Sequence, residues 1–252
     1  MEIHMDVKIL EKSPGKMKFI LSDADRGIAN ALRRTLISGV PILAITDVYV
    51  QANNSGLFDE AVAHRLGLIP LTFDPSLFTL QSECRCKGEG CSRCQVTFVL
   101  DREGPATVKA GDMKSTEESV KASDGDIPIT ELLDNQRIKL EATAHLGFGR
   151  DNMRHQGAVA GYQNPVVVKN PKSCDAHTLE KKSGTVVMAP EDRCAECVKC
   201  VESAEKLTPI ENSFVFKVET ASGLSVAQLL GIALGELEKN AEAFIKETKV
   251  LK

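Results

Sequence analysis

The chain has 252 residues, of which 42% are hydrophobic and 26% charged, enough to bury the core of one large domain or of two to three small ones. A formal net charge of −4, from 31 basic and 35 acidic residues, lacks the basic surplus of an autonomous nucleic-acid-binding protein, and the 4% of aromatic residues leave few base-stacking surfaces. The apolar runs are shorter than the about 20 residues that a membrane span needs, and the start has no signal-peptide pattern. We therefore expect a cytoplasmic protein that enters no membrane and does not bind nucleic acid by itself.

The first predicted element is a β-hairpin. Polar and apolar residues alternate over 3–9 and again over 17–21, and the Ser-Pro-Gly-Lys sequence at 13–16 between them is typical of a turn. We expect two antiparallel strands, each with one buried face.

A helix is predicted next. Asp23 or Asp25 can cap its N-terminus, and Pro41 ends it because proline cannot continue a helix. Apolar residues recur at helical spacing on one face, at Ile28, Leu32 and Leu36. Arg33 and Arg34 lie off that stripe.

The middle of the chain is predicted to be rich in strands. A strand begins at 48–50, and a short helix follows at 59–68, with Val62, Leu66 and Ile69 on its buried side. Residues 101–130 are polar and weakly periodic, which predicts loops and short strands. Strict alternation predicts further strands at 137–148 and 214–218.

The last predicted element is a long helix. Ser225 and Gln228 have the spacing of a capping box, and an apolar side follows for about 24 residues, or roughly 36 Å. Its members are Val226, Leu229, Leu230, Ala233, Leu237, Ala241, Phe244 and Ile245. A core helix is one interpretation. A helix that binds a partner is favoured, because little chain follows to cover it.

Eight cysteines fall into two groups of four, which indicates metal sites rather than a secreted disulfide scaffold. The first group lies on a loop of eleven residues, at Cys84, Cys86, Cys91 and Cys94. Gly88 and Gly90 let this loop fold back so that four sulfur atoms reach one tetrahedral ion at about 2.3 Å. Four sulfur ligands leave no open position, so structural zinc is predicted. Free or disulfide-paired cysteines, or a redox dithiol, are less favoured.

The second group consists of Cys174, Cys194, Cys197 and Cys200. Bacterial-type ferredoxins repeat C-x-x-C-x-x-C-x-x-x-C, and the fourth cysteine of each run binds the cluster of the other run. In that alignment one cluster has lost all its ligands, which are replaced by Asn164, Val167, Asn170 and Ala204. The other cluster keeps all four cysteines. Because the losses segregate by cluster, we predict a single iron–sulfur cluster, with short strands at 166–168 and 185–188 around it.

Two alternatives stay open for this second group. Four cysteines with a long middle gap also suit a zinc ribbon. If Cys174 lies too far away, a three-iron cluster on Cys194, Cys197 and Cys200 replaces the four-iron form.

No catalytic motif is found in the sequence. It lacks a phosphate-binding loop, a nucleophile elbow and the H-E-x-x-H motif. The carboxylates of Asp124 and Asp126 flank a glycine, which is more typical of a solvated turn than of a two-metal site. His64, His145 and His155 are interpreted as core or surface residues. We expect no catalysis by this chain alone.

Three segments resemble the alpha-type subunits of RNA polymerases. They are Ala-Asn-Ala-Leu-Arg-Arg-Thr-Leu-Ile at 29–37, Ala-His-Arg-Leu-Gly-Leu-Ile-Pro-Leu at 63–71, and Ala-His-Leu-Gly-Phe-Gly-Arg at 144–150. With the cysteine loop and the ferredoxin-like insertion, the whole chain is similar to the archaeal D-subunit family. One departure lies at 152–157, where Asn-Met-Arg-His-Gln-Gly replaces the His-Ala-Lys-Trp-Gln-Pro often found in the family.

The resemblance implies an α+β architecture in three parts. Residues 1–45 and 211–252 would form one discontinuous dimerisation domain of the alpha-subunit type. Residues 46–163 would form an inserted, mostly-β domain with the zinc loop, and residues 164–210 a small ferredoxin-like domain.

The resemblance also implies a role in assembly. The family's D subunit pairs with the small subunit L and forms a platform for the large subunits and for the small subunits N and P. We expect the interface to bury Leu32, Leu36, Leu229, Leu230 and Leu237. Arg33 and Arg34 are candidates for contacts with a large subunit, although simple solvation of a helix flank is equally compatible with their position. The alternative is a soluble iron–sulfur electron-transfer protein, which the cluster motif alone would allow.

Overall fold

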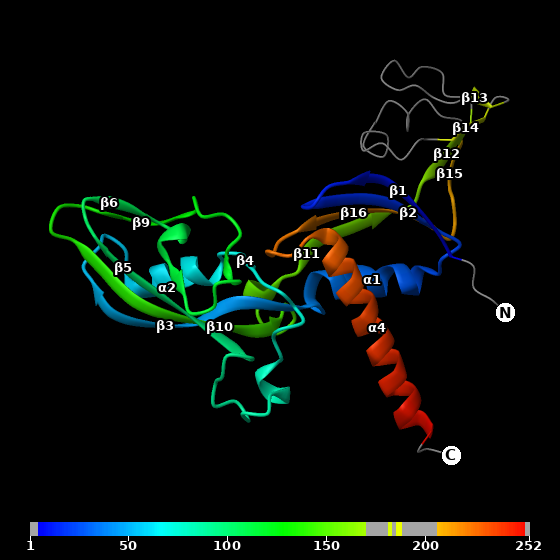
Figure 1. Cartoon of the computed structure of the whole chain (residues 1–252). Coiled ribbons are helices and arrows are strands. Elements are labelled where there is room, and N and C mark those ends of the chain that lie inside the picture. The colour runs from blue at the N-terminus through cyan, green and yellow to red at the C-terminus, as the bar shows by residue number, and fades with distance from the viewer. Residues whose placement is uncertain (1–4, 170–180, 183–184, 188–205, 250–252) are drawn as a thin grey trace. The chain divides into compact units, whose positions relative to one another are not determined.

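The computed structural model describes residues 5–169, 181–182, 185–187 and 206–249 (Figure 1). Internal contacts divide the chain into two compact units, residues 1–33 with 160–218 and residues 34–159 with 219–252. Within the described ranges, every helix is too short or too polar to cross a membrane.

The first unit contains a four-stranded sheet. Its strands neighbour each other in the order β1 (Asp6–Lys12), β2 (Lys16–Ser22), β16 (Ser213–Thr220) and β11 (Ala158–Gln163). The predicted hairpin is confirmed: β1 and β2 are antiparallel, and the backbone N–H of Ser13 donates to the carbonyl of Lys16 at 2.8 Å. On the sheet, the rings of Phe19 and Phe216 stack with centroids 5.0 Å apart.

The prediction that each hairpin strand has one buried face is wrong for β1, which has no buried residue. Met5, Val7 and Ile9 are each about half exposed, at 46%, 56% and 53%. β1 is an edge strand, and nothing in the described part of the chain covers this side of it. The alternation correctly predicted a strand but not whether another surface covers it.

A second small sheet in this unit has the order β13 (Lys181–Lys182), β14 (Thr185–Val187), β12 (Val166–Lys169) and β15 (Lys206–Pro209). The strands predicted at 166–168 and 185–188 are thus confirmed as β12 and β14. The chain enters and leaves this segment at one place, because the N–H of Ile210 donates to the carbonyl of Pro165 at 2.8 Å. The side-chain amide of Asn164 closes the same junction by donating to the carbonyls of Ile210 and Ser213, at 3.3 and 2.9 Å.

Helix α1 (Arg26–Ser38) begins where it was predicted. A carboxylate oxygen of Asp25 accepts from the N–H of Gly27 at 2.6 Å and caps the helix. Its buried stripe is Ala29, Leu32 and Leu36, whereas Ile28, the first member of the predicted apolar face, is 38% exposed. The next strand starts at Pro41 rather than near Val48, because proline can begin a strand as well as end a helix.

The second unit is built around a four-stranded sheet. Its order is β3 (Pro41–Asn53), β10 (Arg137–Phe148), β5 (Gln95–Glu103) and β7 (Lys114–Ser115). β10 is central and pairs antiparallel with both long neighbours, as expected of its alternating pattern. Helix α2 (Asp59–Gly67) buries Val62 and Leu66 completely, so the predicted short helix is confirmed.

Residues 101–130 form loops and short strands, as predicted. The short strand pairs are β4 (Leu71–Thr72) with β8 (Lys121–Ala122), and β6 (Ala106–Lys109) with β9 (Pro128–Leu132). Short 3-10 turns complete the unit at η1 (Gln81–Glu83), η2 (Ala110–Asp112) and η3 (Met153–His155).

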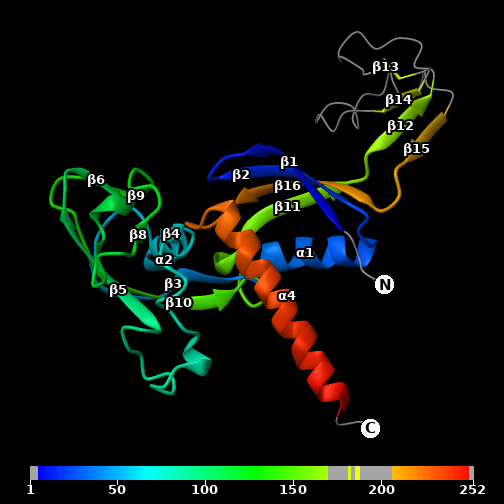
Figure 2. The same ribbon diagram turned by 45° about the vertical axis from the view of Figure 1, so that its right-hand side comes forward.

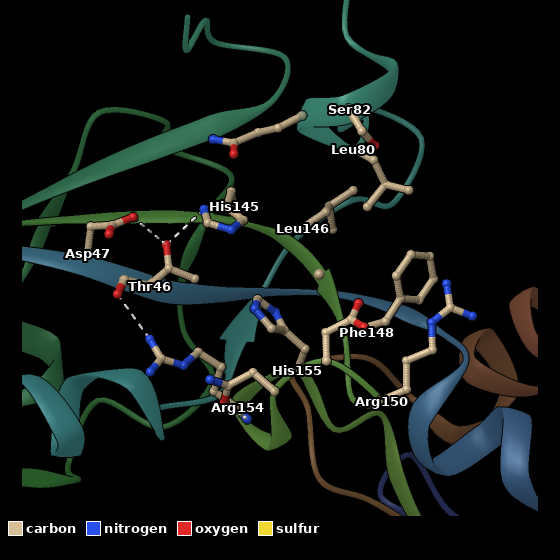
Figure 3. A pocket seen from close by; sticks show the side chains of 14 residues that line it. Thr46, Asp47, Leu80, Ser82, His145, Leu146, Phe148, Arg150, Arg154 and His155 are labelled. Carbon is tan, nitrogen blue, oxygen red and sulfur yellow. Dashed lines mark hydrogen bonds between the residues drawn. The ribbon is translucent and has the colours of Figure 1, made fainter. Parts of the chain in front are cut away.

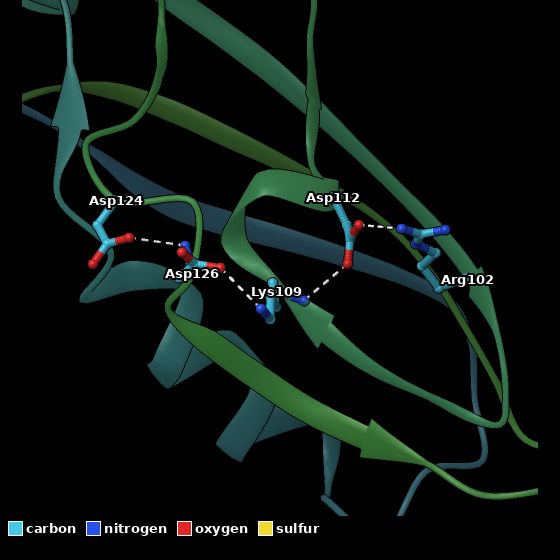
Figure 4. A network of polar contacts seen from close by, with 5 residues as sticks. All are labelled: Arg102, Lys109, Asp112, Asp124 and Asp126. Atoms are coloured by element: carbon cyan, nitrogen blue, oxygen red, sulfur yellow. Dashed lines mark hydrogen bonds and ion pairs between the residues drawn. The ribbon is translucent and has the colours of Figure 1, made fainter.

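A network of charged side chains ties these short strands together (Figure 4). Asp112 pairs with Arg102 and also accepts from the backbone N–H of Lys109 at 2.9 Å. The ammonium group of Lys109 bonds to Asp126 at 2.8 Å, and the N–H of Asp126 donates to Asp124 at 2.8 Å. Asp124 therefore stabilises the turn at 124–126, and Asp126 links this turn to the end of β6.

Helix α4 (Val226–Lys249) is one uninterrupted helix (Figure 2). The predicted capping box is confirmed: the N–H of Ser225 donates to the Gln228 side chain at 3.0 Å, and the N–H of Gln228 donates to the Ser225 hydroxyl at 3.4 Å. The first turns bury Val226, Leu229 and Ala233. The turns after Ala233 contain no buried residue.

Candidate metal centre and interaction surfaces

The first cysteine group lies on one closed loop of the second unit. The loop starts after η1 and ends at β5, which begins directly after Cys94. Its base is closed by the N–H of Thr79, which donates to the carbonyl of Arg93 at 2.9 Å. Cys94 is fully buried, whereas the other three cysteines are partly exposed. The loop is thus anchored to the sheet through Cys94.

The four sulfur atoms converge on one point. All lie within 4.8 Å of one another, and they are the one group of three or more such ligands in the described residues. The Sγ atoms of Cys84 and Cys91 are 3.5 Å apart, those of Cys86 and Cys94 are 3.5 Å apart, and those of Cys91 and Cys94 are 3.8 Å apart. Sulfur atoms at the corners of a tetrahedron with metal–sulfur bonds of about 2.3 Å are about 3.8 Å apart. The geometry therefore fits one tetrahedral ion.

The loop reverses direction through left-handed backbone conformations. Lys87, Gly88 and Gly90 have φ values of 54°, 88° and 88°. The two glycines adopt this region without steric cost, as the sequence predicted. The turns are held by the N–H of Lys87 to the carbonyl of Cys84 at 3.0 Å and by the N–H of Cys94 to the carbonyl of Cys91 at 2.9 Å.

The thiols of this loop differ strongly in acidity. A hydrogen bond from the Cys84 side chain lowers the pKa of Cys86 to about 6. Burial raises the pKa of Cys94 to about 12. The group without metal is therefore a mixture of thiolate and thiol at neutral pH. Four thiolates need a cation to hold them together, so metal binding releases protons.

The second cysteine group, Cys174, Cys194, Cys197 and Cys200, lies outside the described residues. Asn164, which occupies a lost ligand position in the ferredoxin alignment, is described, and its amide closes the entry to the segment. The iron–sulfur cluster remains a prediction.

The predicted interface residues differ widely in exposure. Leu36 and Leu229 are completely buried within the chain, and Leu32 is 7% exposed. Leu230 and Leu237 are partly exposed. The Arg33 guanidinium donates to the Asn30 side chain at 3.0 Å, and Arg34 is exposed. Among these leucines, only Leu230 and Leu237 have appreciable surface to offer a partner.

The apolar surface of α4 lies further along the helix. Leu234, Phe244 and Ile245 are 55%, 71% and 51% exposed. Phe244 and Ile245 belong to the predicted apolar side, but Leu234 was missed because it lies off that stripe. The exposed side chain of a Leu or Phe on a surface helix marks a candidate contact with another molecule.

The second unit combines an antiparallel sheet with a four-cysteine loop. Residues 48–162 match the family described as the RNA polymerase Rpb3/RpoA insert domain. This range covers the last six residues of β3, the cysteine loop, β5, β10 and the η3 turn. The domain is thus that of an alpha-type RNA polymerase subunit.

The sequences of known RNA polymerase subunits align with nearly the whole chain. DNA-directed RNA polymerase subunit Rpo3 of Methanosarcina acetivorans is 38% identical over 96% of this chain and 97% of its own length. The Rpo3 subunits of Archaeoglobus fulgidus and Pyrococcus furiosus are 36% and 34% identical, over 96% and 98% of this chain. The chain belongs to the Rpo3 family of DNA-directed RNA polymerase subunits. These relatives give no support to the electron-transfer alternative.

Proposed function

We propose that this chain is a non-catalytic assembly subunit of DNA-directed RNA polymerase, equivalent to the archaeal D subunit. The observation that carries the proposal is the near full-length similarity to Rpo3 subunits, which covers both units. In this role the chain pairs with the small subunit L, and the pair is a platform for the large subunits and for N and P. Arg34, exposed on α1, and its neighbour Arg33 then bind a large subunit.

The three-part domain division belongs to the same proposal. The match over residues 48–162 supports an inserted domain at 46–163. The junction at Asn164, Pro165 and Ile210 supports a separate domain at 164–210. Residues 1–45 and 211–252 would then make up the dimerisation domain.

The cysteine loop would hold structural zinc. Four sulfur ligands at tetrahedral spacing support zinc and leave no position for a substrate. Zinc here would fix the loop and perform no chemistry.

Cys174, Cys194, Cys197 and Cys200 would hold one iron–sulfur cluster. Their spacing supports it, as do the paired strands β12 and β15 on either side of the segment. A four-iron cluster uses all four cysteines, and a three-iron cluster uses the last three.

Helix α4 offers the sharpest test of the assembly role. We expect Phe244→Asp to abolish copurification with the small subunit, because an exposed apolar side chain that becomes buried in the interface is replaced by a charge. Asn240→Asp introduces the same charge at an exposed polar position of the same helix and is the control. The measurement is the recovery of polymerase subunits with the tagged chain.

Failure of the wild-type chain to recover any polymerase subunit would refute the assembly role. Equal recovery with Phe244→Asp and the wild type would remove the distal part of α4 from the interface.

A further inference from the structure

A pocket of about 680 Å³ lies within the second unit (Figure 3). Its walls come from β3 at residues 46–47, from residues 80–82 just before the cysteine loop, from the end of β10 at 145–148, and from the turn and η3 at 150–155. A volume of this size accommodates several side chains of another molecule.

Two side chains that line the pocket are hydrogen-bonded to the backbone of β3. The guanidinium of Arg154 donates from one nitrogen to the backbone carbonyls of Ile45 and Thr46, at 3.2 and 3.0 Å. The buried ring of His155 donates from Nδ1 to the carbonyl of Ile42 at 2.8 Å. Gly147 lies against this ring, and a Cβ atom there would come within 2.6 Å of Nε2. The side chains of Arg154 and His155 are therefore held in place by hydrogen bonds to the backbone of β3.

The guanidinium of Arg154 is engaged by two backbone carbonyls, whereas that of Arg150 lies against an aromatic ring. The guanidinium carbon of Arg150 lies 4.2 Å above the centre of the Phe148 ring, as a cation–π contact, and the residue is exposed. Figure 3 shows the two side chains together at the pocket. Within the described part of the chain, no carboxylate forms an ion pair with Arg150. A guanidinium positioned by a ring is preorganised to bind a carboxylate through two hydrogen bonds.

The rest of the lining selects among anions. Asp47 and Asp151 lie on the same pocket and repel the higher charge of a phosphate more than that of a carboxylate. Leu80 and Phe148 add apolar surface, which suits a peptide segment with acidic and apolar side chains. A nucleic-acid backbone offers no apolar group of this kind, and the chain carries a net charge of −4.

We propose that this pocket is a docking site for a segment of another polymerase polypeptide, and that a carboxylate of that segment binds Arg150 over the Phe148 ring. The inference rests on the proposed assembly function, which supplies the polypeptide partners. It goes further by assigning one pocket, one residue and one chemical class of contact.

The test is photo-cross-linking in the assembled polymerase, with p-benzoylphenylalanine in place of Ser82 on the pocket wall. We expect an adduct with a segment of another subunit that contains Asp or Glu. Arg150→Gln should lower the yield of this adduct about tenfold or more, because a hydrogen bond between charged groups is lost. Arg150→Lys keeps the charge and should restore part of the yield. The cross-linker in place of Ser119, an exposed residue outside the pocket, is the control, and any adduct there should not depend on Arg150.

The outcomes separate this inference from the proposed function. If the chain copurifies with the other subunits but the adduct at residue 82 forms with nucleic acid, with this chain alone, or not at all, the docking site is refuted while the assembly role stands. An adduct whose yield is unchanged by Arg150→Gln refutes the role of Arg150. Absence of every polymerase subunit from the preparation refutes the assembly role itself.

Discussion

At the scale of single residues, the surroundings of His145 and His155 determine their charge. His155 and His145 were both interpreted as core or surface residues, and the structure places His155 at 4% exposure with its ring beside that of His145, 5.9 Å away between centroids. Burial lowers the pKa of each, and the hydrogen bond to Ile42 only partly opposes this for His155. Both rings are therefore neutral at pH 7.

The buried histidine makes stability depend on pH. In the unfolded chain a histidine takes up a proton near pH 6.5, whereas the folded protein resists protonation until a lower pH. The contribution of the neutral His155 ring to the free energy of unfolding is thus complete above about pH 6.5. It is lost as the pH falls from there through the lowered pKa of the folded protein. We expect urea unfolding to show a smaller loss of stability from pH 7.5 to 5.5 in His155→Asn than in the wild type. His64→Asn, at an exposed histidine, should keep the wild-type loss, and an unchanged loss in His155→Asn would contradict the prediction.

The two cysteine groups should bind metal independently. Cys94→Ser removes the buried ligand of the loop and is expected to remove bound zinc while leaving iron unchanged. Cys197→Ser is expected to remove or reduce bound iron while leaving zinc unchanged. Zinc, iron and sulfide analysis of anaerobically purified protein measures both. Loss of both metals in either variant would contradict independent sites, and the absence of both from the wild type would refute the metal assignments.

At the scale of elements, periodicity predicted type well and burial less well. β10, α2 and the capping box of α4 lie where the pattern placed them, because each signal is local. The buried face of α1 is rotated from the predicted one, so that Ala29 rather than Ile28 is covered. A small residue carries little weight in an apolar pattern, yet it allows the closest packing.

The capping box gives a prediction for α4. Ser225→Ala removes the hydroxyl that accepts from Gln228 and should lower the free energy of unfolding by about 1 kcal/mol. Thermal or urea unfolding measures this change. Ser119→Ala, at an exposed serine whose hydroxyl bonds only to Glu117, should change stability by less than about 0.5 kcal/mol. Equal effects of the two substitutions would show that the cap does not stabilise the helix.

At the scale of the molecule, the two ends of the insertion meet at the junction of Asn164 with Ile210 and Ser213. Because Pro165 and Ile210 are joined by one backbone hydrogen bond, their chain ends can be bridged by a short turn. We expect replacement of residues 166–209 by a short Asn-Gly turn to leave the sheet of β1, β2, β16 and β11 folded, with the melting temperature changed by less than about 5 °C. Bound iron should be lost and bound zinc kept. Circular dichroism and metal analysis are the measurements, and a variant that does not fold would contradict the prediction.

The sequence by itself determined the family, the four-cysteine loop and most of the element types. These features depend on the spacing of residues that are close together in the sequence, and this spacing is the same before and after folding. The sequence also showed the alternation of residues 5–9 and the apolar side of α4. It did not show which of these side chains are buried in the folded chain.

Only the tertiary structure decided that Leu36 and Leu229 belong to the core of the chain while Leu234 and Phe244 remain exposed. It alone brought together Arg150, Phe148 and residues 80–82 around one pocket. The physical reason is that periodicity specifies the direction in which a side chain points from its own element. What lies in that direction is fixed by contacts between segments far apart in the chain.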